Sequence, residues 1–252
     1  MAVYKITLGH AVSDENGYSR GGKPGDQKQN ADNTKGECLF RDWYISGDKW
    51  DFVARCTDAY KRMLIAEDMI KAVKNPLIGY NQDHRYTLYD DVKKLDFDCG
   101  RVDKKVECDC STLVTVCANY AGIPIPRETA TSSMRKTYEN TRLFKIYTSA
   151  EYTMSAEKLK VGDILTRSGH HTATVVNTLY HFIRELKKGM TGDDIKALQY
   201  RLTELKVADL VVDGDFGKKS EEAVKAFQKG ISVDADGIVG EKTATALGFL
   251  WR

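Results

Sequence analysis

The chain has 252 residues, of which 42% are hydrophobic and 29% charged, as in a soluble globular protein with one large domain or two smaller ones. A formal net charge of +2 argues against a nucleic-acid-binding protein, which usually carries a far more basic surface. No run approaches the roughly 18 apolar residues of a membrane span, and the start, MAVYKITLGHAVSDENG, lacks the apolar core of a signal peptide. We therefore expect a protein made in the cytoplasm without a membrane partner, which something else must release if it acts outside the cell.

Six cysteines are spread through the chain, three of them in the stretch VECDCSTLVTVC at 106–117. This density is too low for a disulfide scaffold. No C-x-x-C motif occurs, and no second Cys or His pair has zinc-finger spacing. We predict no metal site and no cofactor, so a catalytic thiol is the chemistry to consider.

The first 50 residues are rich in glycine and polar groups, which favours loops with a short strand at 3–8. His10, beside Gly9, is expected in a loop that could line a cleft. Four closely spaced aromatic side chains follow: Trp43, Tyr44, Trp50 and Phe52. Such a group is typical of a packed surface.

The next part of the chain shows the hydrophobic periodicity of helices. Apolar residues at three- and four-residue steps predict a helix over 57–74 and a second one over 85–95. Asp109 is a good N-cap for a third helix that starts at Cys110 and stops at YAGIPIP. A shorter helix is expected over 130–140.

After these predicted helices, hydrophobic residues recur with a period of two residues. Three short β-branched segments between turn residues predict strands: 143–148, 162–167 and 171–176. The segment 179–183 suggests a hairpin that returns along the last strand. Helices followed by antiparallel strands predict an α+β domain, which we place at 1–183.

The remainder, 184–252, contains one motif twice, DGDFGKKS at 213–220 and DGIVGEKT at 236–243. Each copy leads into a helix, which Ser220 or Thr243 could cap, and the repetition indicates a small helical bundle. The copies lack the alternating carboxylates of a calcium loop.

Cys110 opens a helix, where unpaired N–H groups and the dipole are expected to lower the thiol pKa and to hold an oxyanion. A cysteine nucleophile also needs a base. His171 opens a strand after a glycine turn, which suits that role. Cys117 is expected in the core, whereas Cys108 has no assigned role.

The motif D-C-S-x-L-V at 109–114, the G-D-(apolar) strand at 162–164 and His171 resemble the NlpC/P60 family of papain-like cysteine peptidases. The resemblance implies helices packed on an antiparallel sheet, with Cys110 as nucleophile and His171 as base. The C-terminal repeat resembles the peptidoglycan-binding-1 domain, a three-helix wall-binding module. The N-terminal segment resembles phage lysins of Gram-positive bacteria.

Two family features have no direct match. The family's Y-x-W-G-G motif is missing, and Tyr80 in IGYNQDHR is the nearest substitute for a substrate-positioning residue. The usual place of the third catalytic residue falls on Ile183, so Asn177 and His181 are the polar candidates nearby. We take Asn177 as this residue, which requires a hairpin that folds it back toward His171.

These features predict an endolysin, a cysteine endopeptidase that cleaves a peptide bond in the stem or cross-link of bacterial peptidoglycan. Its partner would be the cell wall, and the sequence leaves the scissile bond, the third catalytic residue and the oligomeric state open. Three alternatives remain: an N-acetylmuramoyl-L-alanine amidase with the same dyad, a non-catalytic wall-binding protein, and a secreted effector that acts on host protein. The intact dyad argues against the second alternative and the wall-binding repeat against the third.

Overall fold

The computed structural model describes residues 6–177, 181, 182, 184–247 and 249–251. Contacts within the chain divide it into two compact units, Met1–Thr178 and Leu179–Arg252. The sequence placed this division five residues later. No helix in the described part of the chain has both the length and the apolar character to cross a bilayer.

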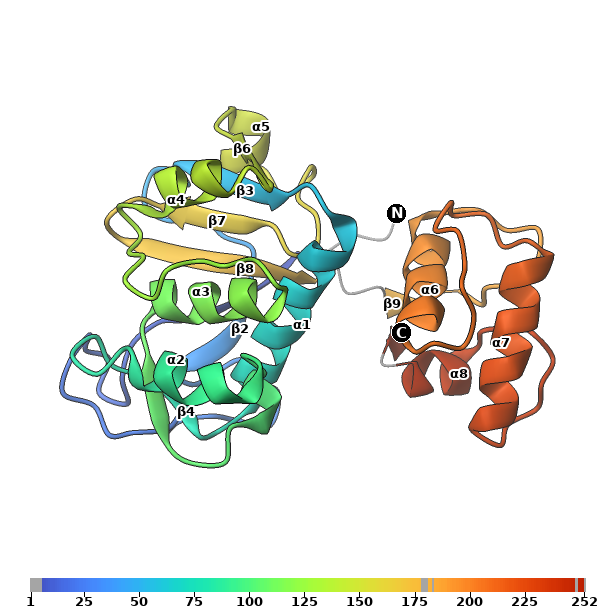
Figure 1. Cartoon of the computed structure of the whole chain (residues 1–252), viewed down its shortest axis with the longest axis horizontal. Helices are drawn as coiled ribbons and strands as arrows, with labels where there is room; N and C mark the ends of the chain where they lie inside the picture. The colour runs from blue at the N-terminus through green and yellow to red at the C-terminus, as the bar shows by residue number, and fades with distance from the viewer. Residues whose placement is uncertain (1–5, 178–180, 183, 248, 252) are drawn as a thin grey trace. The chain divides into compact units, whose positions relative to one another are not determined.

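The N-terminal unit is built on a six-stranded antiparallel sheet with the order β2-β1-β8-β7-β3-β6 (Figure 1). Its strands are β1 (Thr7–Ala11), β2 (Cys38–Asp42), β3 (Phe52–Cys56), β6 (Phe144–Tyr147), β7 (Ile164–Arg167) and β8 (His171–Asn177). A separate parallel pair consists of β4 (Ile78–Tyr80) and β5 (Val106–Cys108).

The helices of this unit are α1 (Ala59–Lys74), α2 (Thr87–Val92), α3 (Cys110–Tyr120), α4 (Met134–Thr141) and α5 (Ala150–Thr153), with 3-10 turns at Lys93–Leu95 and Cys99–Arg101. Helices α1 and α3 pack on each other, and both contact β8 (Figure 1). The four helices predicted from periodicity thus correspond to α1, α2 with its 3-10 extension, α3 and α4. The mixed α+β class with an antiparallel sheet is confirmed.

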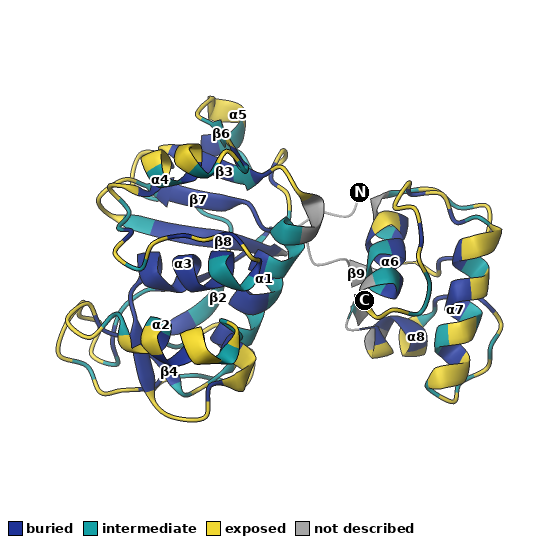
Figure 2. Cartoon of the chain, in the orientation of Figure 1, coloured by how far each residue is buried: buried dark blue, intermediate teal, exposed yellow. Residues whose placement is uncertain are grey.

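Alternating side chains of the strands separate into two apolar clusters. Phe52 and Ala54 of β3 belong to the large core that includes α1 and α3. Val53, between them, belongs to a second cluster with Trp50 and Val175. Figure 2 shows α3 as the most continuously buried helix of the unit, since its residues from Cys110 to Ala118 are all buried. The candidate nucleophile therefore starts a helix that the core fixes on most sides.

The sequence did not reveal β2 and β3, and it placed the first strand at 3–8, which overlaps β1 only at Thr7 and Leu8. β1 and β2 lie in the first 50 residues, which were read mainly as loops. Gly9 illustrates the reason, because a glycine within β1 weakens the strand pattern. A Cβ at Gly9 would lie 2.6 Å from Cγ of Met69 and 2.7 Å from Cγ1 of Val176, so the close approach of α1 to the sheet requires glycine here.

The predicted hairpin at the end of the domain is wrong. β8 runs without interruption to Asn177, and β9 (His181–Phe182) pairs in parallel with β10 (Leu250–Trp251) of the C-terminal unit. Predicting this pairing would require knowing that residues nearly 70 positions apart meet, and local turn signals carry no such information.

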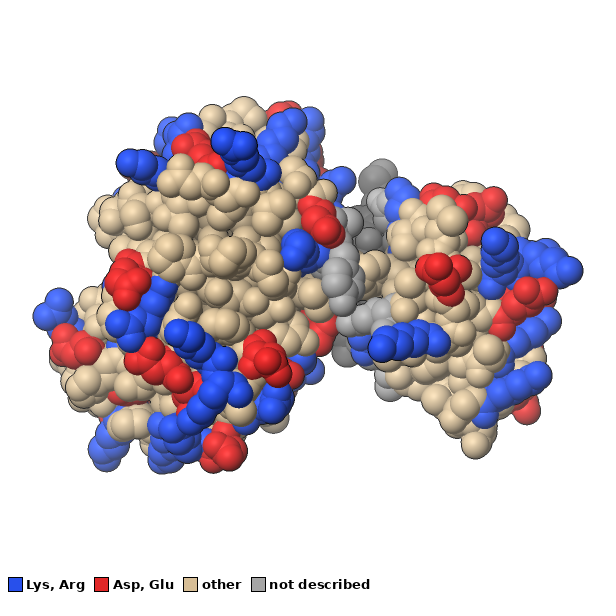
Figure 3. Space-filling view, viewed as in Figure 1, with Lys and Arg blue, Asp and Glu red and all other residues tan. Residues whose placement is uncertain are grey.

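The C-terminal unit contains α6 (Asp193–Glu204), α7 (Lys218–Gly230) and α8 (Glu241–Ala246), with a core that includes Leu198, Phe216 and Val224. In Figure 3 lysines, arginines and acidic residues are interspersed over its visible face, without a field of one sign.

The two D-G-x-(apolar)-G copies form equivalent turns in this unit. Gly214 and Gly237 have φ of 82° and 80°, the left-handed region that glycine adopts without strain. The N–H of each glycine donates to the side-chain oxygen of a buried glutamine, Gln199 or Gln228, at 2.9 Å. Each glutamine amide also donates to the aspartate of its turn at 2.8 Å. The sequence predicted the repeat but not these glutamines.

The two hydroxyl side chains after the turns do not act as helix caps. Ser220 and Thr243 lie in the first turns of α7 and α8, where they accept hydrogen bonds from Gln199 and Gln228 at 3.3 and 3.2 Å. They therefore stabilise the turns from within the helices.

Candidate active site

Cys110 starts α3, and Asp109 caps it as predicted. The backbone of Asp109 is extended, and its Oδ1 accepts from the N–H of Thr112 at 2.7 Å and from the hydroxyl of Ser111 at 2.9 Å. The other carboxylate oxygen accepts from Arg85 at 2.8 Å. Each oxygen of this buried carboxylate thus has a partner, which fixes the backbone next to the thiol.

The thiol of Cys110 is only 6% exposed and has the backbone N–H of Thr172 beside it. Burial and the charge of Asp109 raise the pKa of Cys110 to about 12, although the N–H groups of Thr172, Ser111 and Cys110 act in the opposite direction. The expectation that the helix start lowers this pKa is therefore wrong, because desolvation outweighs the helix N–H groups.

His171 begins β8 and directly precedes Thr172, so the contact between Thr172 and Cys110 brings the candidate base and the candidate nucleophile near each other. Burial, and then the nearby charge of Arg41, lower the pKa of His171 to about 4. At neutral pH both groups are uncharged, which suits general-base removal of the thiol proton better than a preformed ion pair.

The G-D motif before β7 has a structural role that supports His171. Asp163 is fully buried and accepts from Nε and Nη2 of Arg55 at 2.7 and 2.6 Å. Gly162 has a φ of 76°, and a Cβ there would lie 1.8 Å from the carbonyl oxygen of Arg62. These contacts join the start of β7 to β3 through Arg55 and to α1 through Arg62, and so fix the β7–β8 hairpin that carries His171.

A second histidine, His10, completes the arrangement. Its Nδ1 lies 2.7 Å from Nε2 of His171, and the residue is 1% exposed on β1. Burial, then the charges of His171 and Arg41, lower the pKa of His10 well below its usual range. The expectation of a loop histidine is wrong for His10. A strand reading of TLGHA would have been the signal, since it places His10 on the same face as Leu8.

The bond between the two histidines orders their protons. If His171 is to accept the thiol proton at Nδ1, its Nε2 must carry a hydrogen and donate to Nδ1 of His10. His10 is then protonated on Nε2, a buried atom with no hydrogen-bond partner among the described residues. A neutral His10 therefore orients His171 in the tautomer that catalysis requires.

Aromatic rings form one side of the site. The ring of Trp50 lies 6.1 Å from that of His171, and the ring of Tyr44 lies 5.9 Å from that of His10, measured between centroids. Trp50 donates its indole N–H to the carbonyl of Tyr44 at 2.8 Å, and the guanidinium of Arg41 lies 4.1 Å above the Tyr44 ring. Two of the four aromatic residues noted in the sequence, Tyr44 and Trp50, thus form a wall of the candidate site.

Tyr80 ends β4 and is 4% exposed. Burial, and next the charge of Cys110, raise the pKa of its hydroxyl, which is therefore near the thiol. Gln82 donates to this hydroxyl at 3.1 Å, and buried Glu37 accepts from the backbone N–H of Tyr80 at 2.8 Å. The structure brings Tyr80 to Cys110, and its role in positioning substrate stays a prediction.

Asn177 is not brought to the site in this way. Asn177 pairs with Thr7 at the far end of β8, about 20 Å along the strand from His171. His181 belongs to the C-terminal unit. The side chains of both lie outside the described residues.

The remaining cysteines are free and buried. Cys117 lies in the core of α3 as predicted, and Cys108 donates its S–H to the carbonyl of Gly79 at 3.4 Å. Cys108 therefore packs in the core beside the site. Within the described ranges no three His, Cys, Asp or Glu side chains are grouped for a metal ion.

We expect the rate at which iodoacetamide alkylates Cys110 to rise steadily from about pH 7 to 9, because the thiol pKa is about 12. The Cys110 peptide would be quantified by mass spectrometry, with the Cys110→Ala chain as the blank for the other cysteines. A rate that reaches a plateau below about pH 8 would show a preformed thiolate and contradict this prediction.

The chain matches known protein families over two separate ranges. Residues 8–179, more than half of the chain, match the family described as "Endolysin-like domain". The chain belongs to the endolysin-like domain family. Residues 191–247 of this endolysin-like chain match a second family, described as "Putative peptidoglycan binding domain".

Individual relatives match shorter parts of the endolysin-like chain. It is 38% identical over 73 residues to N-acetylmuramoyl-L-alanine amidase CwlM of Mycobacterium tuberculosis, covering 29% of this chain and 17% of that protein. It is 41% identical over 64 residues to N-acetylmuramoyl-L-alanine amidase CwlL of Bacillus licheniformis, covering 25% of this chain and 18% of that protein. The chain thus matches less than a fifth of the length of these curated relatives.

Two solved structures are also similar. The SleB N-terminal domain is 32% identical with a TM-score of 0.25, covering 26% of this chain and 89% of that one. A peptidoglycan-binding protein from Clostridioides difficile, in complex with glutamine hydroxamate, is 28% identical with a TM-score of 0.26. The match covers 42% of this chain and 58% of that one.

Proposed function

We propose that this endolysin-like chain is a peptidoglycan hydrolase that cleaves a peptide bond in the stem or cross-link through Cys110 and His171. The observation that carries the proposal is that the backbone N–H of Thr172, the residue after His171, lies beside the helix-start thiol, while Nε2 of His171 lies 2.7 Å from His10. We also propose that the domain predicted at 1–183, whose compact unit ends at Thr178, is catalytic, and that the domain predicted at 184–252, whose compact unit begins at Leu179, binds the wall.

The first chemical step is attack by Cys110 on the peptide carbonyl. His171 removes the thiol proton at Nδ1 as the S–C bond forms, since its Nε2 is engaged with His10. The negative charge that develops on the carbonyl oxygen would be stabilised by the N–H groups of Cys110 and Ser111 at the start of α3, which face the thiol. One such donor contributes about 10²–10³ to the rate in hydrolases of this type.

The intermediate then collapses. His171 returns the proton to the leaving amine, the C–N bond breaks and an acyl-thioester on Cys110 remains. Water, deprotonated by the same imidazole, hydrolyses the thioester and restores the thiol. The peptidoglycan-binding unit would hold the enzyme on an insoluble polymer and so raise the local concentration of scissile bonds.

Mass spectrometry of wall digests tests the proposed bond. We expect the wild-type chain to release fragments with new peptide amine and carboxyl ends, and the Cys110→Ala chain to release none. Stem peptides freed whole, with the amine of their first alanine exposed, would instead identify an amidase that uses the same dyad. Wild-type digests without either product would contradict the hydrolase assignment.

Replacing His10 by alanine is expected to lower kcat by roughly 10²-fold with little change in KM, because the substrate still binds while His171 loses its orienting partner. His10→Gln, which keeps a side-chain acceptor, should recover part of this loss. Steady-state rates on a soluble wall fragment measure both effects. Equal rates for His10→Ala and the wild type would exclude a positioning role.

A further inference from the structure

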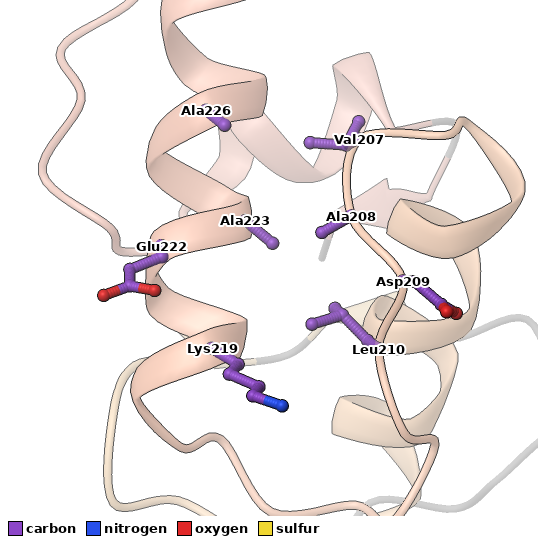
Figure 4. Close-up of a pocket in the computed structure, with 8 residues that line it drawn as sticks. All are labelled: Val207, Ala208, Asp209, Leu210, Lys219, Glu222, Ala223 and Ala226. Carbon is purple, nitrogen blue, oxygen red and sulfur yellow. The ribbon is translucent and has the colours of Figure 1, made fainter.

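The C-terminal unit has a groove along α7. Two hollows of about 310 and 500 Å³ share Val207 and Ala226 in their linings, so they are continuous. The groove lies between α7 and the segment 205–210 that follows α6 (Figure 4). We call it the α7 groove.

The floor of the first hollow consists of small apolar side chains. Val207, Ala208, Ala223 and Ala226 point into the gap from its two sides in Figure 4. These side chains have no hydrogen-bonding group, so a hydroxyl-rich ligand would lose bonds to water on this floor without replacing them. The floor therefore favours a ligand that presents methyl groups.

Leu205 lines the second hollow, and two more exposed apolar side chains directly follow the segment 205–210. Leu205, Val211 and Val212 are 40%, 71% and 43% exposed, and they lie within eight residues of one another. They account for half of the large exposed hydrophobic side chains in the described part of the chain. Such a concentration at a surface is typical of a binding site.

One end of the groove carries a positive charge, Lys219, which points into the gap, whereas the carboxylate of Asp209 points away from it (Figure 4). Among the described residues, Lys219 has no ion-pair or hydrogen-bond partner, whereas Glu222 is 3.8 Å from Lys218 and points away from the gap. A ligand with a carboxylate would therefore find a partner in Lys219.

We propose that the α7 groove binds the peptide stem of peptidoglycan and not its glycan strand. The alanine methyl groups of the stem lie on the apolar floor, and the free carboxylate at its C-terminus pairs with Lys219. The proposal rests on the wall-directed function above, and it adds which part of the polymer the C-terminal unit recognises.

Calorimetric titration of the full chain tests this, with Cys110→Ala present to prevent cleavage. The probes are the pentapeptide L-Ala–γ-D-Glu–L-Lys–D-Ala–D-Ala, the same peptide with an amidated C-terminus, and peptide-free glycan strands. We expect the free-acid peptide to bind, and both amidation and Lys219→Gln to weaken binding about fivefold, the range of an exposed ion pair. Lys219→Gln should have no further effect on the amidated peptide.

Two variants separate the groove from general charge effects. Ala226→Trp fills the groove from an exposed position and should abolish peptide binding. Lys229→Gln removes a positive charge from α7, as Lys219→Gln does, but outside the groove, and should leave peptide binding unchanged. Undetectable peptide binding, glycan binding as tight as that of the peptide, or unchanged binding in Lys219→Gln and Ala226→Trp would overturn the proposal. Hydrolysis of walls is measured separately, so failure of the groove assignment is distinguishable from failure of the catalytic one.

Discussion

Cys110→Ala is expected to lower wall hydrolysis by about 10⁵-fold or more, to the level of a blank, because no other group can form the acyl intermediate. The thiol is nearly buried and its removal deletes a single sulfur atom, so the fold should be retained at a cost of about 1 kcal/mol. Dye release from labelled Gram-positive walls measures the loss, and circular dichroism on heating measures the stability.

Cys117→Ala is the matched control, since this cysteine lies on the same helix and is fully buried in its core. We expect it to lose about 1–2 kcal/mol of stability while keeping its hydrolytic rate at temperatures where it is folded. A Cys110→Ala chain that still cleaves walls, or a Cys117→Ala chain that is folded but inactive, would refute the assignment of the nucleophile.

His171→Ala is expected to lower kcat by about 10³–10⁴-fold, because the thiol would then have to ionise without a base. With a thiol pKa of about 12, very little thiolate exists at neutral pH, and this makes the base more important than in an enzyme with a preformed ion pair. KM should change little, since the substrate contacts other groups. Steady-state rates over a range of substrate concentrations separate the two parameters.

His170→Ala is the control for this variant. His170 precedes His171 but is exposed in the β7–β8 turn, so its removal should leave kcat within about twofold. A similar fall in kcat in both variants would indicate damage to the turn and not the loss of a base. Activity retained by His171→Ala would mean that another group takes the thiol proton.

Part of the candidate site could be recognised from short segments. Asp109 and Cys110 are adjacent, and the N-cap preference of aspartate defines the helix start whatever surrounds it. His171 was found because a glycine turn and a β-branched strand are local patterns. In the C-terminal unit, the two D-G turns were visible for the same reason, because the left-handed glycines repeat in the sequence itself.

His10 and Asn177 show where this approach fails. His10 lies 161 positions before His171, and the two meet only because β1 pairs with β8 at the centre of the sheet. Asn177 is close to His171 in the sequence but lies at the opposite end of an extended strand. Which polar group faces His171 follows from strand order, and no local pattern encodes it.

By itself, the sequence determined the α+β class, the four helices, the nucleophile and base candidates, and the repeat in 184–252, since each depends on contacts within a few residues. Only the tertiary structure decided that β2 and β3 join β1 in the sheet, that His10 is the partner of His171, and that the Cys110 thiol is held neutral. Strand order and burial depend on residues far apart in the chain, and burial reverses the pKa shift expected from the helix start alone.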